Sequence, residues 1–221
     1  MDVNVSQFNQ LVQTLAIYAL PVLFAITLHE AAHGYVARHF GDMTAHAQGR
    51  ISLNPIRHVD VIGTIVVPLA VLYMSGTKFL FGWAKPVPVN YSALRKPRQH
   101  MAWVAAAGPA ANLLMALIWV LLLKLAVVQP QNGFWAFLGM MSQAGIVVNL
   151  VFMFLNLLPI LPLDGGRILA SLLPRRAAGQ YARLEPLGVP LLIVLLLTNV
   201  LNFVLEPLVG ASDALIRAIV F

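Results

Sequence analysis

Two histidines and a glutamate near residue 30 are the side chains in this sequence best suited to metal chemistry. His29 and His33 lie four positions apart, so on a helix they share one face and can offer two imidazole nitrogens to one zinc ion. Glu30 would lie roughly 60° round the helix from His33, at about 100° per residue. Its carboxylate would then lie beside the metal, where it could take a proton from water that the metal activates.

The residues before this His-Glu-x-x-His motif favour a metal site over an ordinary pair of buried histidines. No Asp, Glu, Lys or Arg occurs from Val3 to Leu28. The apolar segment from about Phe8 to Tyr35 is long enough to cross a hydrocarbon core of roughly 30 Å. An ionisable group at the end of such a segment is costly unless it has a partner, and ionisable residues inside spans usually carry function.

The composition is that of a protein that crosses a membrane several times. The chain has 221 residues, of which 60% are hydrophobic and 10% charged, and its mean hydropathy is +0.82. These values lie outside the range of ordinary soluble domains. The N-terminus lacks the positive region and the cleavage site of a signal peptide, so the first apolar segment is expected to remain as a span.

The absence of cysteine restricts the chemistry further. Disulfides, thiolate metal sites and cysteine nucleophiles are excluded, so any zinc must be held by His, Asp or Glu. The formal net charge is +6, but the basic residues lie between apolar runs instead of forming one stripe. This distribution is typical of membrane-flanking loops and gives no indication of a nucleic-acid partner.

A second apolar segment, from about His100 to Val128, contains the small-residue run Ala105–Asn112. Small residues let helices approach closely in lipid, so this face is expected to pack against the histidine-bearing helix. Asn112 is the strongly polar side chain of this segment. An interhelical hydrogen bond and a donor role toward a reacting carbonyl explain it equally well.

A third apolar segment, Phe134 to Leu163, ends in two prolines and then a carboxylate, Asp164. Irregular backbone near membrane depth is tolerated only where it lines a cavity or is buried in protein. Asp164 is therefore the candidate third metal ligand, with room for a substrate backbone at the next two glycines and with Arg167 orienting the carboxylate. The alternative is that Asp164 only caps a helix that starts near Gly165.

Several stretches between and after these segments have weaker patterns. Residues 49–55 alternate as an edge strand would, and 85–90 form an extended loop; either could pair with an unwound substrate. Residues 186–205 are expected to span, whereas 208–221 form a short span or an interfacial helix. The remaining histidines of the polar loop are expected to be interfacial, and His58 could pair with Asp60.

The distribution of charge predicts which way the chain crosses the membrane. Of the 14 Lys and Arg residues, 12 fall in three stretches, 38–57, 78–98 and 167–183. The apolar stretch 61–77 barely reaches across a bilayer and is expected to be re-entrant, which places all three basic stretches on one side. By the positive-inside rule that side is cytoplasmic, and the N-terminus is outside.

The expected fold is therefore an all-α polytopic membrane protein. It is a bundle of about five or six hydrophobic segments with a three-helix catalytic core and short extended loop segments. The chain is expected to form one membrane-embedded domain, 1–221, with the catalytic core at about 8–173 and C-terminal helices at about 186–221.

These motifs together resemble the site-2 protease family of intramembrane zinc metalloproteases. The resemblance rests on His29–His33, on Gly108-Pro109-Ala110-Ala111-Asn112 and on the stretch Asn156–Gly165, in that order along the chain. It looks like the compact form of the family, without a PDZ or CBS domain. The resemblance implies one Zn²⁺ per chain, held by His29, His33 and Asp164, with Glu30 as the catalytic base and acid. It also implies that Asn112 and Asn156 assist the binding of substrate or intermediate.

The resemblance also implies partners and a location. Transmembrane proteins would be the substrates, cut within or near their spans, and the enzyme would be a multi-pass protein of the cell membrane with its active site near the cytoplasmic side. Two alternatives have the same site residues: a zinc-binding membrane transporter and a non-catalytic adaptor that binds membrane helices. A transporter should carry further acidic or histidine groups along its spans, and these spans hold few.

Overall fold

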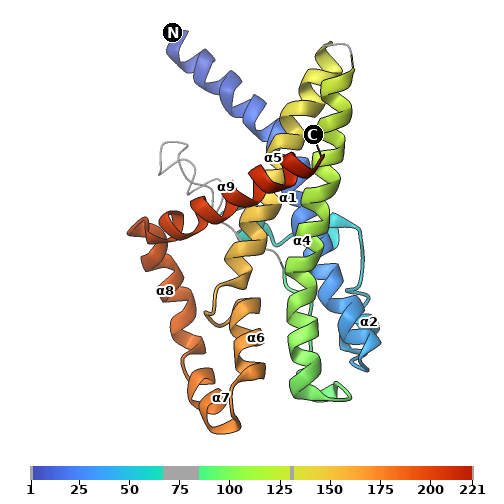
Figure 1. The fold of residues 1–221 in the computed structure, drawn as a ribbon, viewed down its shortest axis with the longest axis vertical. Helices are drawn as coiled ribbons and strands as arrows, with labels where there is room; N and C mark the ends of the chain where they lie inside the picture. The colour runs from blue at the N-terminus through green and yellow to red at the C-terminus, as the bar shows by residue number, and fades with distance from the viewer. Residues whose placement is uncertain (1, 67–84, 130–131, 221) are drawn as a thin grey trace.

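The described parts of the computed structural model, residues 2–66, 85–129 and 132–220, contain helices and connecting segments and no strand (Figure 1). This confirms the predicted all-α class. The helices are α1 (Asp2–His39), α2 (Thr44–Ala47), α4 (Pro97–Val128), α5 (Gly133–Leu157), α6 (Asp164–Leu172), α7 (Arg175–Ala182), α8 (Glu185–Leu197) and α9 (Val200–Val220). Short 3₁₀ turns lie at Pro55–Arg57 and Tyr91–Ala93, and a π-helical turn lies at Val61–Val66.

Three helices are long and apolar enough to cross a membrane. They are α1 from Phe8 to His39, α4 and α5, with 32, 32 and 25 residues. At a rise of about 1.5 Å per residue, each exceeds a hydrocarbon core of roughly 30 Å. The pair α7 and α8, bent by 61°, makes a fourth span if it is counted as one. These helices show that the chain is a membrane protein.

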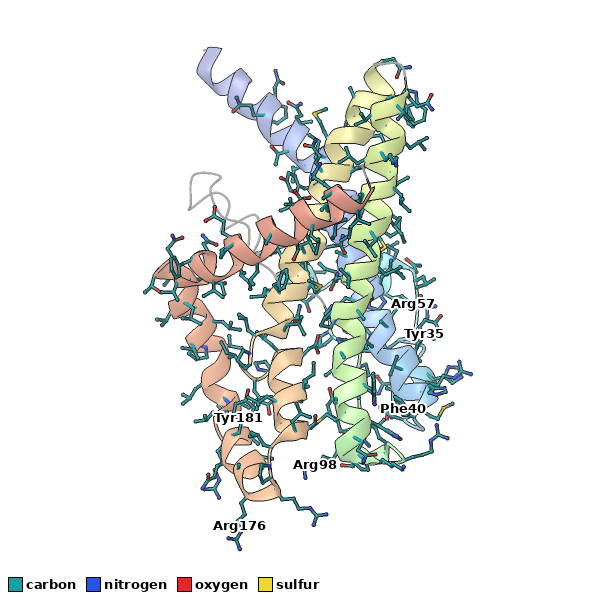
Figure 2. All side chains as sticks on the ribbon, in the orientation of Figure 1. Tyr35, Phe40, Arg57, Arg98, Arg176 and Tyr181 are labelled. Carbon is teal, nitrogen blue, oxygen red and sulfur yellow. The ribbon has the colours of Figure 1, made fainter. Side chains whose placement is uncertain are left out.

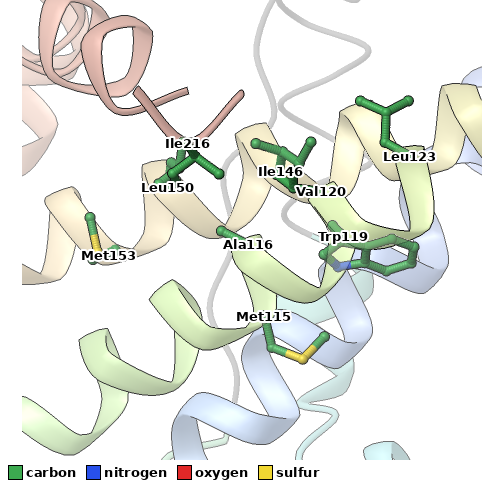
Figure 3. Close-up of a cluster of buried hydrophobic side chains, with 9 residues drawn as sticks. All are labelled: Met115, Ala116, Trp119, Val120, Leu123, Ile146, Leu150, Met153 and Ile216. Atoms are coloured by element: carbon green, nitrogen blue, oxygen red, sulfur yellow. The ribbon is translucent and has the colours of Figure 1, made fainter. Parts of the chain in front are cut away.

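Helices α1, α4 and α5 pack against one another, and α6 continues from α5 along α4. A buried cluster joins α4 and α5, with Ile216 of α9 packed onto it (Figure 3); its members are Met115, Ala116, Trp119, Val120, Leu123, Ile146, Leu150, Met153 and Ile216. Gly145 permits this close contact, because a Cβ there would lie 2.3 Å from a ring atom of Trp119. This is the small-residue packing that helices in lipid require.

The break between α5 and α6 sets the position of Asp164. Helix α5 ends at Leu157, and α6 begins at Asp164 after an irregular connection that contains both prolines. Arg98 of α4 donates hydrogen bonds to the carbonyl oxygens of Ser171, Leu172 and Leu173 at the end of α6. A cation at a helix C-terminus satisfies carbonyl groups that have no partner within the helix, so α6 is fixed against α4 at that end.

The prediction of one span over residues 186–205 is wrong. Helix α8 ends at Leu197, and Asn199 has a left-handed backbone with φ of 61° before α9 begins. Asn is among the few residues that adopt this conformation readily. Helix α9 then crosses α5 at an angle (Figure 1). The sequence left the role of residues 208–221 open; residues 208–220 form the second half of α9, and Phe221 lies outside the described residues.

The connecting segments differ in part from the expectations. Residues 85–90 are extended, as predicted, whereas 49–55 form no strand: the Arg50 amide bonds to Ala45 O at 2.9 Å, and the Asn54 amide bonds to Ser52 Oγ. Local partners therefore replace a strand ladder. Of the stretch predicted to be re-entrant, 61–66 is a π-helical turn, and 67–77 lies outside the described residues.

Some of the basic residues lie at one end of the molecule. In Figure 1 the start of α1, the end of α4 and the start of α5 lie at one end, and α7 and the start of α4 lie at the other, with α2 nearer to this second end. Figure 2 shows the labelled Arg98 and Arg176 at that second end, whereas the labelled Arg57 lies nearer the middle of the molecule. The basic residues of α4 and α7 therefore share one end, as the charge distribution predicted, and Arg57 lies farther from it.

Gly145→Ala is expected to destabilise the protein by about 1–3 kcal/mol, because the new methyl group would collide with Trp119. Thermal unfolding in detergent measures the change. The matched control is Gly139→Ala on the same helix, where a Cβ meets its nearest atom at 3.9 Å. That variant should be neutral or slightly more stable, since Ala favours helix over Gly. Equal melting temperatures for the two variants would contradict this packing account.

Candidate metal centre

The fold brings Asp164 to the two histidines, although 131 positions separate it from His33 in the sequence. Oδ2 of Asp164 lies 3.3 Å from Nε2 of His29 and 3.3 Å from Nε2 of His33. The two Nε2 atoms are themselves 3.1 Å apart. His29 and Asp164 are buried and His33 is half-buried. The predicted ligand set therefore converges on one point between α1 and the start of α6.

Hydrogen bonds on the far side of each imidazole determine which nitrogen faces this point. Nδ1 of His29 lies 2.7 Å from Oδ1 of Asn112, and Nδ1 of His33 lies 2.7 Å from the carbonyl oxygen of Val104. Both partners are acceptors, so each Nδ1 carries the proton and each Nε2 presents a lone pair. An acceptor behind each histidine is the usual support of a metal-ligating imidazole.

The converging atoms fit a divalent cation. Two Nε2 lone pairs and a carboxylate oxygen repel one another unless a proton or a metal ion lies among them. Oδ2 of Asp164 is buried and has no hydrogen-bond partner among the described residues. A carboxylate binds a metal in its ionised form, so a metal ion at this point would give Oδ2 the partner that it lacks.

Gly108 lets α4 approach the site. A Cβ at this position would lie 2.5 Å from Cε1 of His29 and 2.6 Å from Nε2 of His33. The expectation that the small-residue face of this segment packs against the histidine-bearing helix is confirmed. Glycine here is a requirement of the site's geometry, since a side chain would occupy the space of the imidazoles.

The residues after Asp164 differ from their predicted roles. Helix α6 begins at Asp164 itself and Leu163 is its N-cap residue, so Asp164 is not the cap of a helix that starts near Gly165. A Cβ on Gly165 would lie 2.1 Å from Leu157 O, so the chain's own backbone fills the room predicted for a substrate. Arg167 pairs with Glu185 at 3.3 Å and lies over the ring of Tyr91, so its contacts differ from the predicted one with Asp164.

Glu30 has a partner that the sequence did not indicate. Its Oε2 accepts a hydrogen bond of 2.7 Å from the backbone amide of Val87, in the extended segment 85–90. Val87 is buried against α1, where a Cβ on Gly34 would lie 3.2 Å from its side chain. The extended segment thus runs along the face of α1 that carries Glu30.

Three polar residues hold the extended segment in place. Buried Asp42 accepts the Asn90 amide at 2.7 Å. Arg50 donates to the carbonyl oxygens of Lys85 and Pro86, and buried His58 accepts the Lys85 amide on its own carbonyl oxygen. The structure therefore gives His58 a structural role, with Nε2 bonded to Ser52 O at 2.8 Å. Sequence reasoning assigned no role to Asp42 or Arg50, because their partners lie 35 to 48 positions away.

The two asparagines carried over from the family motifs lie in different surroundings. Asn112 is fully buried, and its Nδ2 donates to Ala25 O at 3.2 Å and to Asn149 Oδ1 at 3.1 Å. Both amide hydrogens are therefore used within the protein, which favours the interhelical explanation. Asn156, in the last turn of α5, is half-buried and donates to Phe152 O at 3.0 Å.

Comparison with known proteins agrees with this geometry. Residues 124–198, which include Asp164, match Peptidase family M50. The chain is 38% identical over 202 residues to "Putative zinc metalloprotease YwhC" of Bacillus subtilis, covering 90% of this chain and 88% of that protein.

More distant relatives carry a related name. The chain is 32% identical over 184 residues to "Putative zinc metalloprotease Rip2" of Mycolicibacterium smegmatis, and 28% identical over 180 residues to the Rip2 of Mycobacterium tuberculosis. Each alignment covers 81% of this chain and 66% of the relative. No solved structure matched the chain.

The helical membrane fold, the two-histidine, one-carboxylate cluster and the match to peptidase relatives together define a membrane-embedded zinc metalloprotease. More narrowly, the extent and identity of the match to YwhC show that the chain belongs to the site-2 protease family, peptidase family M50.

Gly108→Ala is expected to weaken zinc binding by tenfold or more, on the order of 1.4 kcal/mol, because the methyl group displaces the two imidazoles. Metal analysis of purified protein after dialysis against a weak chelator measures this. Gly210→Ala is the control, since a Cβ at that position meets nothing within 4 Å. A Gly108→Ala protein that keeps wild-type zinc content would show that the imidazoles are not confined as described.

Proposed function

We propose that this zinc metalloprotease hydrolyses peptide bonds of membrane-protein substrates within or near their transmembrane segments. His29, His33 and Asp164 would hold the zinc, and Glu30 would act as general base and then general acid. The observation that carries the proposal is the cluster of three ligand atoms within 4.8 Å of one another, on and beside a membrane-spanning helix. A site that lies among membrane-spanning helices is best placed to act on substrates that also lie in the membrane.

The chemistry assigned to the protein's own groups follows from their positions. A zinc ion at this site would supply a Lewis acid that polarises a substrate carbonyl and makes water more acidic. The Val87 amide holds Oε2 of Glu30, which restricts the carboxylate to one orientation. We assign the other oxygen, Oε1, to the proton that leaves water and then passes to the departing amine.

The bilayer position of the site supports a cytoplasmic location. His29 and His33 lie in the last third of the span Phe8–His39, and Asp164 follows the end of α5. The start of α6 lies on the side of α5 toward α7 and the start of α4, where Arg98 and Arg176 lie (Figures 1 and 2). By the positive-inside rule, we infer a multi-pass protein with its active site near the cytoplasmic face.

A substrate helix would have to unwind before its backbone could reach the site, because helical carbonyl groups are hydrogen-bonded and shielded. The extended segment 85–90 lies beside Glu30 and is the best-placed partner for an unwound strand. Val87 commits its amide to Glu30, so the amide that remains for such pairing is that of Val89. Pro86 and Pro88 have no amide hydrogen to offer.

Substituting the proposed ligands and the base should separate zinc binding from turnover. His29→Ala, His33→Ala and Asp164→Ala are expected to lose zinc, whereas Glu30→Gln should keep it and lose cleavage by about 10²–10⁴-fold. Metal analysis and cleavage of a co-reconstituted membrane substrate give the two readouts. Full zinc occupancy in Asp164→Ala would remove Asp164 from the ligand set, and an active Glu30→Gln protein would overturn the role of Glu30.

Val87→Pro should reduce cleavage by about tenfold while zinc content stays unchanged, because the substitution deletes the amide that orients Glu30. Val87→Ala keeps that amide and serves as the control, with most of its cleavage retained. Equal activity of the two variants would mean that the bond between Val87 and Glu30 does not matter for catalysis.

Single cysteines test the orientation, since the chain has none of its own. Introduced at Gln48, Ser92 and Gln180, they should react with an impermeant thiol reagent from the cytoplasmic side. A cysteine at Gly133, the first residue of α5, should react from the opposite side. Labelling of the Gln48 and Ser92 positions from different sides would contradict the proposed topology.

A further inference from the structure

Asn149 is a buried polar residue in the middle of the spanning helix α5 that neither the sequence analysis nor the proposed mechanism uses. Its side chain is fully buried, and the residues of α5 on either side of it, 144–148 and 150–155, are apolar. An amide in such surroundings is costly unless each of its polar atoms has a partner. Asn149 meets this condition: Nδ2 donates to Gly145 O at 2.8 Å, and Oδ1 accepts from Asn112 Nδ2 at 3.1 Å.

The direction of these bonds is forced. A backbone carbonyl can only accept, so Gly145 O requires the NH₂ group of Asn149 to face it. The carbonyl oxygen of the Asn149 side chain must then face Asn112. That oxygen in turn requires the NH₂ group of Asn112, which leaves Oδ1 of Asn112 to face His29.

The orientation of Asn112 decides which tautomer His29 adopts. With Oδ1 at 2.7 Å from Nδ1, His29 must carry its proton on Nδ1 and keep a lone pair on Nε2. If the Asn112 amide rotated by half a turn, Nδ1 would have to accept and the proton would move to Nε2. The nitrogen that faces Asp164 and His33 would then be unable to bind a metal.

We propose that Asn149 is a positioning residue of the zinc site, which fixes the amide of Asn112 and through it the tautomer and ring orientation of His29. We call this chain of hydrogen bonds the relay: it runs from Gly145 O and Asn149 of α5 to the Asn112 side chain of α4 and ends at His29 of α1. The proposal rests on the assignment of His29 as a zinc ligand. Ala25 O also accepts from Asn112, at 3.2 Å, so Asn149 shares this task with the backbone of α1.

A double-mutant cycle on zinc affinity tests the relay. Zinc dissociation constants of the purified full-length chain in detergent are measured by chelator competition for wild type, Asn149→Leu, Asn112→Leu and the double variant. Residues that support metal ligands typically contribute 10–100-fold in affinity, so Asn149→Leu should weaken zinc binding about tenfold. The double variant should bind zinc as Asn112→Leu does, within about threefold, because Asn149 acts through Asn112.

The control is Ser142→Ala, a buried polar position on the same helix whose hydroxyl has no hydrogen-bond partner among the described residues. It should keep wild-type affinity. Asn149→Ser, too short to reach both Gly145 and Asn112, gives the same test where the leucine variant does not fold. Wild-type affinity in the folded Asn149 variant, or losses that multiply in the double variant, would overturn the proposal.

Two further readouts separate this proposal from the assignment on which it rests. In the cobalt-substituted protein, Asn149→Leu should change the visible absorption of the metal and Ser142→Ala should not. Zinc loss in His29→Ala with an unaffected Asn149→Leu would overturn the relay alone. Wild-type zinc content in His29→Ala would overturn the assignment of His29 as a zinc ligand, on which the relay rests. This conclusion does not depend on the proteolytic activity of the variant.

Discussion

The mutual repulsion of three acceptor atoms is the constraint on which the rest of this structure depends. Nε2 of His29, Nε2 of His33 and Oδ2 of Asp164 lie within about one hydrogen-bond length of one another, in a place with little water. In a low-dielectric interior this arrangement is costly unless a cation compensates it. A divalent ion between the three acceptor atoms replaces their repulsion by attraction to the metal. Metal binding and the packing of the helices that carry these atoms therefore stabilise each other.

Each neighbouring element contributes to holding this arrangement. Gly108 brings α4 within reach of both imidazoles, and Val104 and Asn112 accept their Nδ1 protons. The prolines between α5 and α6 end one helix and begin another, which places Asp164 opposite the histidines. The extended segment 85–90 holds Glu30 from the other side, anchored by Asp42 and Arg50.

The part of the site that is local in the sequence could be predicted from it. The spacing of His29 and His33 depends only on helix geometry, and Asp164 was found because a carboxylate after a broken apolar run needs a partner. The close approach of α4 followed from its small residues. Each of these features could be predicted from a single segment of the sequence with a single physical rule.

The remaining features depend on contacts between groups that are distant in the sequence, or on a local backbone conformation, and neither is indicated by residue type alone. The amide of Val87 reaches Glu30 across 57 positions, and any residue except proline could donate it. The glycines after Asp164 face the chain's own backbone. Arg167 pairs with Glu185, the first residue of α8, which α7 brings back to α6. The break at Asn199 interrupts an apolar run that hydropathy alone reads as continuous.

X-ray absorption at the zinc edge of the purified protein tests the central claim most directly. The account predicts one zinc per chain with two imidazole ligands and carboxylate or water oxygen, at about 2.0–2.2 Å. It also predicts that the imidazole scattering falls by about half in His33→Ala protein loaded with excess zinc. A wild-type spectrum with no imidazole scattering, or with three or more imidazoles, would contradict the assignment of His29, His33 and Asp164 as the metal site.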